Sequence, residues 1–146
     1  MNKIHIAALV WLIAVSSCNQ PAQSADNGLP ASIPDSQIIR SVDSRGAERL
    51  LDGEQDIILI DVRTPEEYAE GHLEGAKNMD FHDPKFPEQI RQLDPTQKYM
   101  LYCAVGGRSG KSQKIMEEMG FKEVYNVIEG FKELRELGIP VSTTPE

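Results

Sequence analysis

The sequence predicts an α/β sandwich with a mostly parallel sheet flanked by helices. Three observations predict this fold class. Short apolar runs of strand length alternate with stretches that carry apolar residues at helical spacing, and short turns join them. The run at 56–60 is almost continuously apolar, as in strands buried on both faces. The chain has 146 residues, of which 40% are hydrophobic and 26% charged, which suits one globular domain with a real core.

The first half of the body contains two helices and three strands. The clearest boundary is Thr64-Pro65-Glu66-Glu67, with threonine at the N-cap, proline at the first helical position and acids in the first turn. In chain order we expect an edge strand at 37–40, a helix over 42–51 capped by Gly53, a strand at 56–60, a helix from Thr64 that stops at Gly71, and a short strand at 76–79.

The second half contains three helices and two strands. Apolar side chains at i, i+4 and i+7 predict its first helix, which ends before an Asp-Pro pair. In chain order we expect a helix over 86–93, a strand at 99–102, a helix from Ser109 stopped by Gly120, a strand at 123–127, and a helix over 131–137 closed by Gly138 and Pro140.

Residues 103–109, Cys-Ala-Val-Gly-Gly-Arg-Ser, join the strand at 99–102 to a helix N-terminus. The unpaired N–H groups and the dipole of a helix start stabilise a thiolate, so the pKa of Cys103 should fall below its usual value of ~8.5. Gly106 and Gly107 permit positive φ and inward-facing amides, and Arg108 adds a cation at the same rim. We therefore expect Cys103 to be the nucleophile. The expected substrate-binding residues are Ala104, Val105, Gly106, Gly107, Arg108 and Ser109.

Each of these residues also has a plainer interpretation. Cys103 could be a buried, inert thiol, and Arg108 a surface charge. Asp61 and Arg63 follow a strand end; they could bind substrate, but we expect them to support the site by ordering neighbouring loops. His72 could be a base or ligand, although local packing is the simpler role. No metal site is expected from the histidines.

The N-terminus has the pattern of an export signal. The 12-residue run at 4–15 is apolar except for His5, and it is shorter than the ~20 residues that a spanning helix needs. Val15-Ser16-Ser17-Cys18 resembles a bacterial lipoprotein signal, in which Cys18 becomes lipidated; a plain cleaved signal or an uncleaved segment are the alternatives. We expect a signal peptide at 1–17, a lipid-anchored tether at 18–35, a domain at 36–142 and a tail at 143–146, in an exported periplasmic or cell-envelope lipoprotein.

The charge and the cysteines narrow the possible functions. A net charge of −8 argues against a surface that binds nucleic acid or an anionic membrane. An anionic substrate must therefore be attracted by the loop at Cys103 itself. We expect the protein to contact the membrane only through the lipid on Cys18. If Cys18 carries lipid, Cys103 has no partner in the chain. A lone thiol in an oxidising compartment is unusual, which favours a working cysteine.

Three blocks, at 60–78, 102–109 and 130–141, give the chain a resemblance to single-domain rhodaneses over about residues 36–142. The resemblance implies a three-layer sandwich with a five-stranded, mostly parallel sheet. It implies that Cys103 takes sulfane sulfur from a small anionic donor, thiosulfate or a persulfide or polysulfide. The sulfur then passes from a persulfide to a thiol or cyanide, without metal or cofactor, and we expect a monomer. The chain departs from the family pattern at Ala104, where a basic residue is common in thiosulfate-using members, and at Leu134, where tryptophan is common.

Two other functions compete with sulfur transfer. Cysteine-dependent phosphatases and arsenate reductases use a similar loop of the form Cys-x5-Arg, but here only four residues separate Cys103 from Arg108. The second alternative is a non-turnover sulfide carrier or interaction module at the membrane, which would keep the same cysteine.

Overall fold

The computed structural model describes residues 36–53 and 56–144. The predicted signal peptide, Cys18 and the tether lie outside this part of the chain, so those expectations stay predictions. Within the described residues, no helix is both long and apolar enough to cross a membrane.

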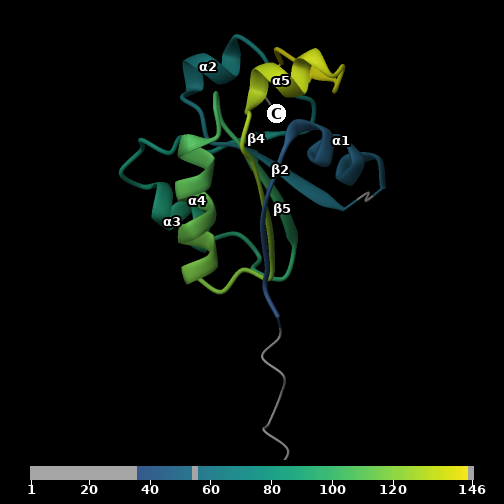
Figure 1. The fold of residues 1–146 in the computed structure, drawn as a ribbon. Helices are drawn as coiled ribbons and strands as arrows, with labels where there is room; N and C mark the ends of the chain where they lie inside the picture. Colours follow the sequence, from purple (N-terminus) through teal and green to yellow (C-terminus); the bar gives the residue numbers. More distant parts are fainter. Residues whose placement is uncertain (1–35, 54–55, 145–146) are drawn as a thin grey trace, which may run out of the picture. The chain divides into compact units, whose positions relative to one another are not determined.

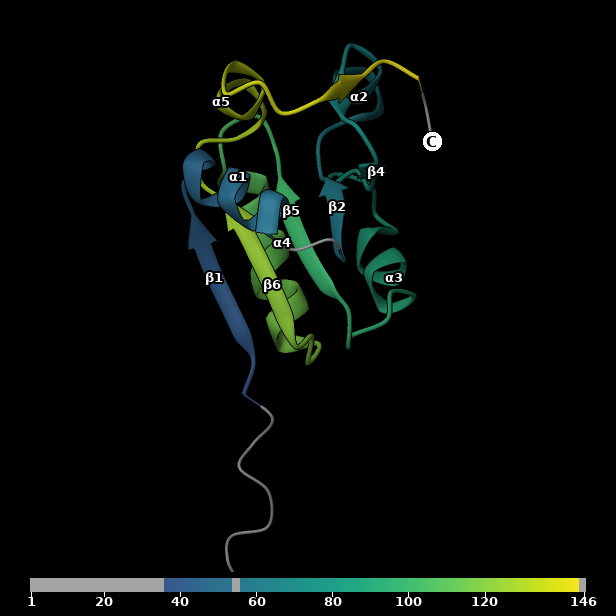
Figure 2. The ribbon, with the colours of Figure 1, turned by 90° about the vertical axis from the view of Figure 1, so that its right-hand side faces the viewer.

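A five-stranded sheet with the order β1-β6-β5-β2-β4 forms the middle layer. All its paired strands are parallel, so their carboxyl ends share one edge, at the top of Figure 2. The strands are β1 (Ile38–Val42), β2 (Ile57–Asp61), β4 (Lys77–Asn78), β5 (Lys98–Tyr102) and β6 (Glu123–Val127). The strands β6, β5 and β2 have neighbours on both sides. In β5 and β6 all residues after the first are accordingly buried.

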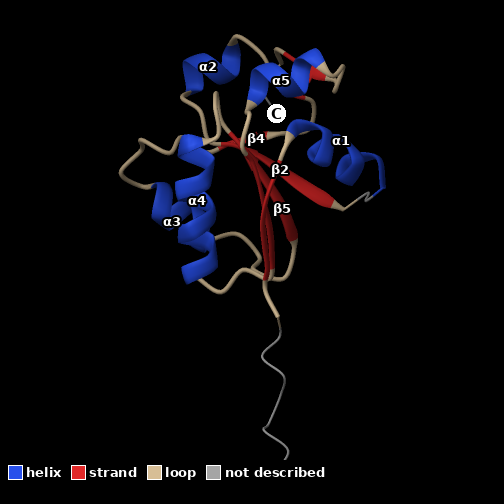
Figure 3. Ribbon diagram, in the orientation of Figure 1, coloured by secondary structure: helices blue, strands red, loops and turns tan. Residues whose placement is uncertain are grey.

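Helices cover both faces of the sheet, as the sequence predicted. In Figures 1 and 3 the helices α3 and α4 lie on one face, whereas α1 and α5 lie on the other. The helices are α1 (Ser44–Gly53), α2 (Pro65–Ala69), α3 (Phe86–Arg91), α4 (Gly107–Glu118) and α5 (Phe131–Glu136). The fold is therefore a three-layer α/β sandwich.

Alternate residues of β5 face the two cores. Tyr99, Leu101 and the following Cys103 belong to the core beneath α3 and α4. Met100 and Tyr102 belong to the second core, beneath α1 and α5. The pleat of the strand thus sends the Cys103 side chain to the α4 side of the sheet.

The structure differs from the predicted elements in three main places. β1 extends to Val42, which was expected in the first helix, so α1 begins at Ser44 and includes Gly53. The helix α4 begins at Gly107, not at Ser109, because residue 106 adopts the left-handed conformation and the chain is helical directly after it. A small antiparallel pair, β3 (His72–Leu73) with β7 (Val141–Ser142), was not expected. With two residues in each strand it carries no periodic signal.

Candidate active site

The sulfur of Cys103 lies at the carboxyl end of β5 and faces the first turn of α4. The backbone N–H groups of Val105, Arg108 and Ser109 face it and act on its charge, and the Ser109 hydroxyl donates to it at 3.5 Å. Burial raises the pKa of the Cys103 thiol, but these donors outweigh burial and leave the pKa below its ordinary value. The inward-facing amides expected from the sequence are therefore present in the structure.

Cys103 is also buried, with 1% of its surface exposed. From the sequence alone, a buried thiol and a working thiol are alternatives; in the structure, burial and the ring of donors occur together. The low dielectric around the sulfur strengthens its hydrogen bonds, so burial does not by itself make this thiol inert. Ala104 is half-buried beside it, and Val105 is 76% exposed.

Two glycines permit the loop at Cys103 to pack against the chain that follows β6. Gly106 has φ 81°, and a Cβ there would overlap the Ile128 carbonyl group. Gly130 has φ 90°, and a Cβ there would overlap the Ala104 carbonyl group. The Phe131 N–H donates to the Cys103 carbonyl oxygen at 2.8 Å. Gly107, in contrast, is helical and not at positive φ, which corrects one of the two positions expected to be left-handed.

Arg108 is not a free cation at the rim. Its Nη1 donates to Glu67 Oε2 at 2.6 Å and its Nη2 to Glu67 Oε1 at 2.8 Å. The hydrogen bond from Arg108 is the main cause that lowers the pKa of Glu67 to about 2. The expectation that Arg108 holds an anionic donor stays a prediction, and the structure adds that the Glu67 carboxylate pairs with its guanidinium.

Asp61 and Arg63 form a buried pair that ties loops together. The Arg63 Nη2 donates to Asp61 Oδ2 and to the Gly71 carbonyl oxygen, both at 2.6 Å. Its guanidinium carbon lies 4.0 Å from the ring centroid of Phe131. Since the side chains of Arg63 and Asp61 are only 6% and 0% exposed, this placement fits the supporting role expected from the sequence.

Among the described residues, no hydrogen bond joins His72 or His82 to Cys103. His72 is buried, stacks on Tyr68 with ring centroids 3.6 Å apart, and its Nδ1 lies 2.9 Å from the Tyr68 carbonyl oxygen. His82 is exposed. In residues 36–53 and 56–144 no group of three or more potential ligands is placed to hold a metal ion.

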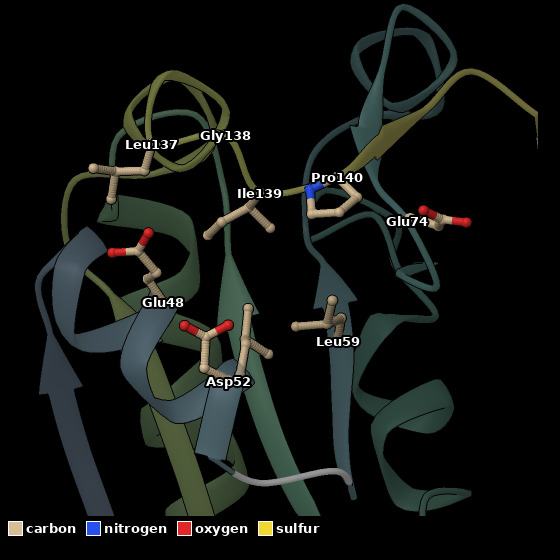
Figure 4. A pocket seen from close by; sticks show the side chains of 9 residues that line it. Glu48, Asp52, Leu59, Glu74, Leu137, Gly138, Ile139 and Pro140 are labelled. Atoms are coloured by element: carbon tan, nitrogen blue, oxygen red, sulfur yellow. The ribbon is translucent and has the colours of Figure 1, made fainter.

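A cavity of about 440 Å³ lies on the opposite face of the sheet, between α1 and the chain after α5 (Figure 4). Apolar side chains such as Leu59 and Ile139 line it, together with the carboxylates of Glu48, Asp52 and Glu74. A thiosulfate or phosphate anion would meet three like charges there. The Cys103 loop is therefore the better candidate for anion chemistry, although the cavity is the more conspicuous hollow.

Sequence reasoning missed two parts of the site. Glu67 was interpreted only as a residue of the first helical turn of α2, and residues 128–130 were not placed against the loop at Cys103. The place of Glu67 at the site could have been inferred from the sequence, because Glu67 follows the end of β2 and the carboxyl ends of parallel strands share an edge. An acidic residue after β2 and a basic residue after β5 are therefore candidates for an ion pair.

Comparisons with known proteins bear on the family and the fold. A model of the rhodanese-like domain matches residues 45–137. The chain is 25% identical over 104 residues to a sulfurtransferase of Allochromatium vinosum, covering 71% of this chain and 95% of that protein. It is 36% identical over 67 residues to the thiosulfate sulfurtransferase PspE of Escherichia coli K12, covering 46% of this chain and 64% of that protein.

A solved structure has the same fold. The crystal structure of a rhodanese-related protein from Thermoplasma volcanium superposes with a TM-score of 0.62 at 25% identity, over 72% of this chain and 99% of that one. The parallel sheet, the loop at Cys103 and the match over residues 45–137 together show that the chain belongs to the rhodanese-like domain family.

Proposed function

We propose that this chain is a sulfurtransferase that carries sulfane sulfur as a persulfide on Cys103. The convergence of the Val105, Arg108 and Ser109 N–H groups on the sulfur is the observation that carries the proposal. Donors in this position stabilise a thiolate before the reaction and the negative charge of a persulfide after it, as an oxyanion hole does. Relatives named as sulfurtransferases support the same chemistry.

The reaction divides into two displacements at sulfur. In the first, the Cys103 thiolate attacks the outer sulfur of the donor; a new S–S bond forms as the donor's S–S bond breaks, and sulfite or a thiolate leaves with the electron pair. In the second, a thiol or cyanide attacks the outer sulfur of the persulfide and the Cys103 thiolate leaves. Neither step calls for a metal or an organic cofactor.

Intact-protein mass spectrometry tests this proposal. The purified chain is incubated with thiosulfate or inorganic polysulfide, weighed, and then treated with cyanide. We expect a gain of one sulfur atom, its loss on adding cyanide, and release of thiocyanate over many turnovers. Cys103→Ser, which keeps the size of the side chain, should show none of these.

The other outcomes of this experiment separate the alternatives. A gain of sulfur without repeated release of thiocyanate would identify a non-turnover carrier. No gain from any sulfane donor would refute sulfur transfer, and hydrolysis of a phosphate ester by the same preparation would favour a phosphatase.

We also propose that the chain is exported and anchored through a lipid on Cys18. The sequence at 15–18 supports this, and the described residues do not bear on it. Expressed with radiolabelled palmitate, the wild-type chain should take up label and Cys18→Ser should not. Equal labelling of both would refute the anchor.

A further inference from the structure

The cation of the loop at Cys103 is held by a carboxylate in a fixed position. Glu67 accepts from both terminal nitrogens of Arg108, so the two planar groups meet edge to edge. Glu67 Oε2 also accepts from the Thr64 N–H at 3.0 Å, while the Glu67 N–H donates to Thr64 Oγ1 at 3.3 Å. This reciprocal capping box at the start of α2 holds the carboxylate in place opposite Arg108.

The charges at the loop therefore sum to a negative value during catalysis. The Cys103 thiolate contributes −1, Arg108 +1 and Glu67 −1, which gives a net −1. The neighbouring loop residues 104–107 carry no charge, and Asp61 with Arg63 is a neutral, buried pair. A donor that carries two negative charges would approach a site of the same sign.

Two exposed aliphatic side chains also lie at the loop. Val105 is 76% exposed and Ile128 is 50% exposed, and the close approach of Gly106 to the Ile128 carbonyl group places their two segments against one another. Exposed aliphatic side chains at this position suit the carbon skeleton of an organic donor better than the oxygens of a sulfonate.

We propose that Glu67 is a specificity-determining residue, whose carboxylate cancels the charge of Arg108 and so selects organic persulfides over dianionic donors such as thiosulfate. This inference rests on the proposed function and names the substrate class of the same site. The favoured step is Cys103–S⁻ + R–S–SH → Cys103–S–SH + R–S⁻. The donor's S–S bond breaks, its outer sulfur moves to Cys103, and the organic thiolate leaves with the electron pair.

The test compares donors in the full chain and in matched variants. Glu67→Gln keeps the length of the side chain and an acceptor for the capping box, but leaves Arg108 with its full charge. We expect its kcat/KM for thiosulfate to rise about tenfold, while kcat/KM for the persulfide of 2-mercaptoethanol, which has no charged group besides its sulfur, changes much less. Glu66→Gln removes the same charge from the exposed neighbouring position and should keep the wild-type ratio of the two donors. Glu67→Asp, which keeps the charge, should stay close to that ratio.

A second measurement does not depend on turnover. Without the Glu67 carboxylate, the charge of Arg108 acts unopposed on the sulfur, so the thiolate absorbance of Cys103 should titrate at a lower pH in Glu67→Gln than in the wild type. Urea unfolding of each variant shows that it is folded.

The results distinguish this inference from the proposed function. If Glu67→Gln accepts sulfur on Cys103 with the wild-type donor ratio and an unchanged thiol titration, Glu67 is only a structural residue and sulfur transfer stands. If neither the wild type nor any variant accepts sulfur from either donor, the proposed sulfur transfer is refuted, and the inference about donor selection is refuted as well.

Discussion

Two arginine–carboxylate pairs lie at the carboxyl edge of the sheet, and they differ in their surroundings. In the pair of Arg63 with Asp61 the side chains are 6% and 0% exposed. In the pair of Arg108 with Glu67 they are 19% and 34% exposed, and Arg108 belongs to the turn that binds the Cys103 sulfur. The two pairs share their chemistry, so burial and neighbours decide their roles. The first connects loops of the scaffold, whereas the second sets the charge next to the Cys103 sulfur.

The largest difference between the pairs should appear in stability. Arg63→Ala leaves the Asp61 carboxylate buried without its partner and removes the bond to the Gly71 carbonyl, so we expect a loss of about 3–5 kcal/mol in the free energy of unfolding. Arg108→Ala breaks a pair that water reaches and should cost below about 1 kcal/mol. Urea unfolding of both variants measures this, and losses of equal size would show that burial does not separate the two roles.

A smaller effect concerns the thiol. Ser109→Ala removes the hydroxyl donor to the Cys103 sulfur but keeps the backbone N–H, so we expect the pKa of Cys103 to be higher than in the wild type. Ser112→Ala is the matched control, because this hydroxyl bonds the Arg108 carbonyl oxygen one turn further along α4. Thiolate absorbance measured against pH gives both values, and equal shifts in the two variants would contradict a direct role of the Ser109 hydroxyl.

Most of the fold could be predicted because its signals are local. The strands β2 and β5 are largely apolar runs of strand length, and Thr64 begins a capping box that is visible in the sequence. The start of α4 was placed two residues late, because Gly107 is a poor helix former and Gly106 precedes it. The burial of Cys103 could have been predicted from the alternation of Tyr99, Leu101 and Cys103 along one strand.

The missing part of the site depends on contacts between distant residues. Glu67 and Arg108 are 41 positions apart, and they meet only because the turns after β2 and β5 open at the same edge. The fit of Gly130 against the Ala104 carbonyl group likewise requires that β6 lie next to β5. No periodicity or capping rule reports such contacts, whereas the pair of Asp61 with Arg63 lies two residues apart and was singled out at once.

The smallest effect is the acid dependence of the pair of Glu67 with Arg108. The pKa of Glu67 is about 2 in the folded protein and ~4.3 in an unfolded chain, so the pair stabilises the fold fully above the unfolded value. That contribution should disappear as the pH falls from ~4.3 through about 2. Because the Glu67 side chain is 34% exposed, we expect the difference in unfolding free energy between wild type and Glu67→Gln to stay below about 1 kcal/mol. Urea unfolding at a series of acidic pH values measures this difference, and molar salt should reduce it. A difference that grew as the pH fell would mean that the carboxylate is protonated in the fold and does not neutralise Arg108.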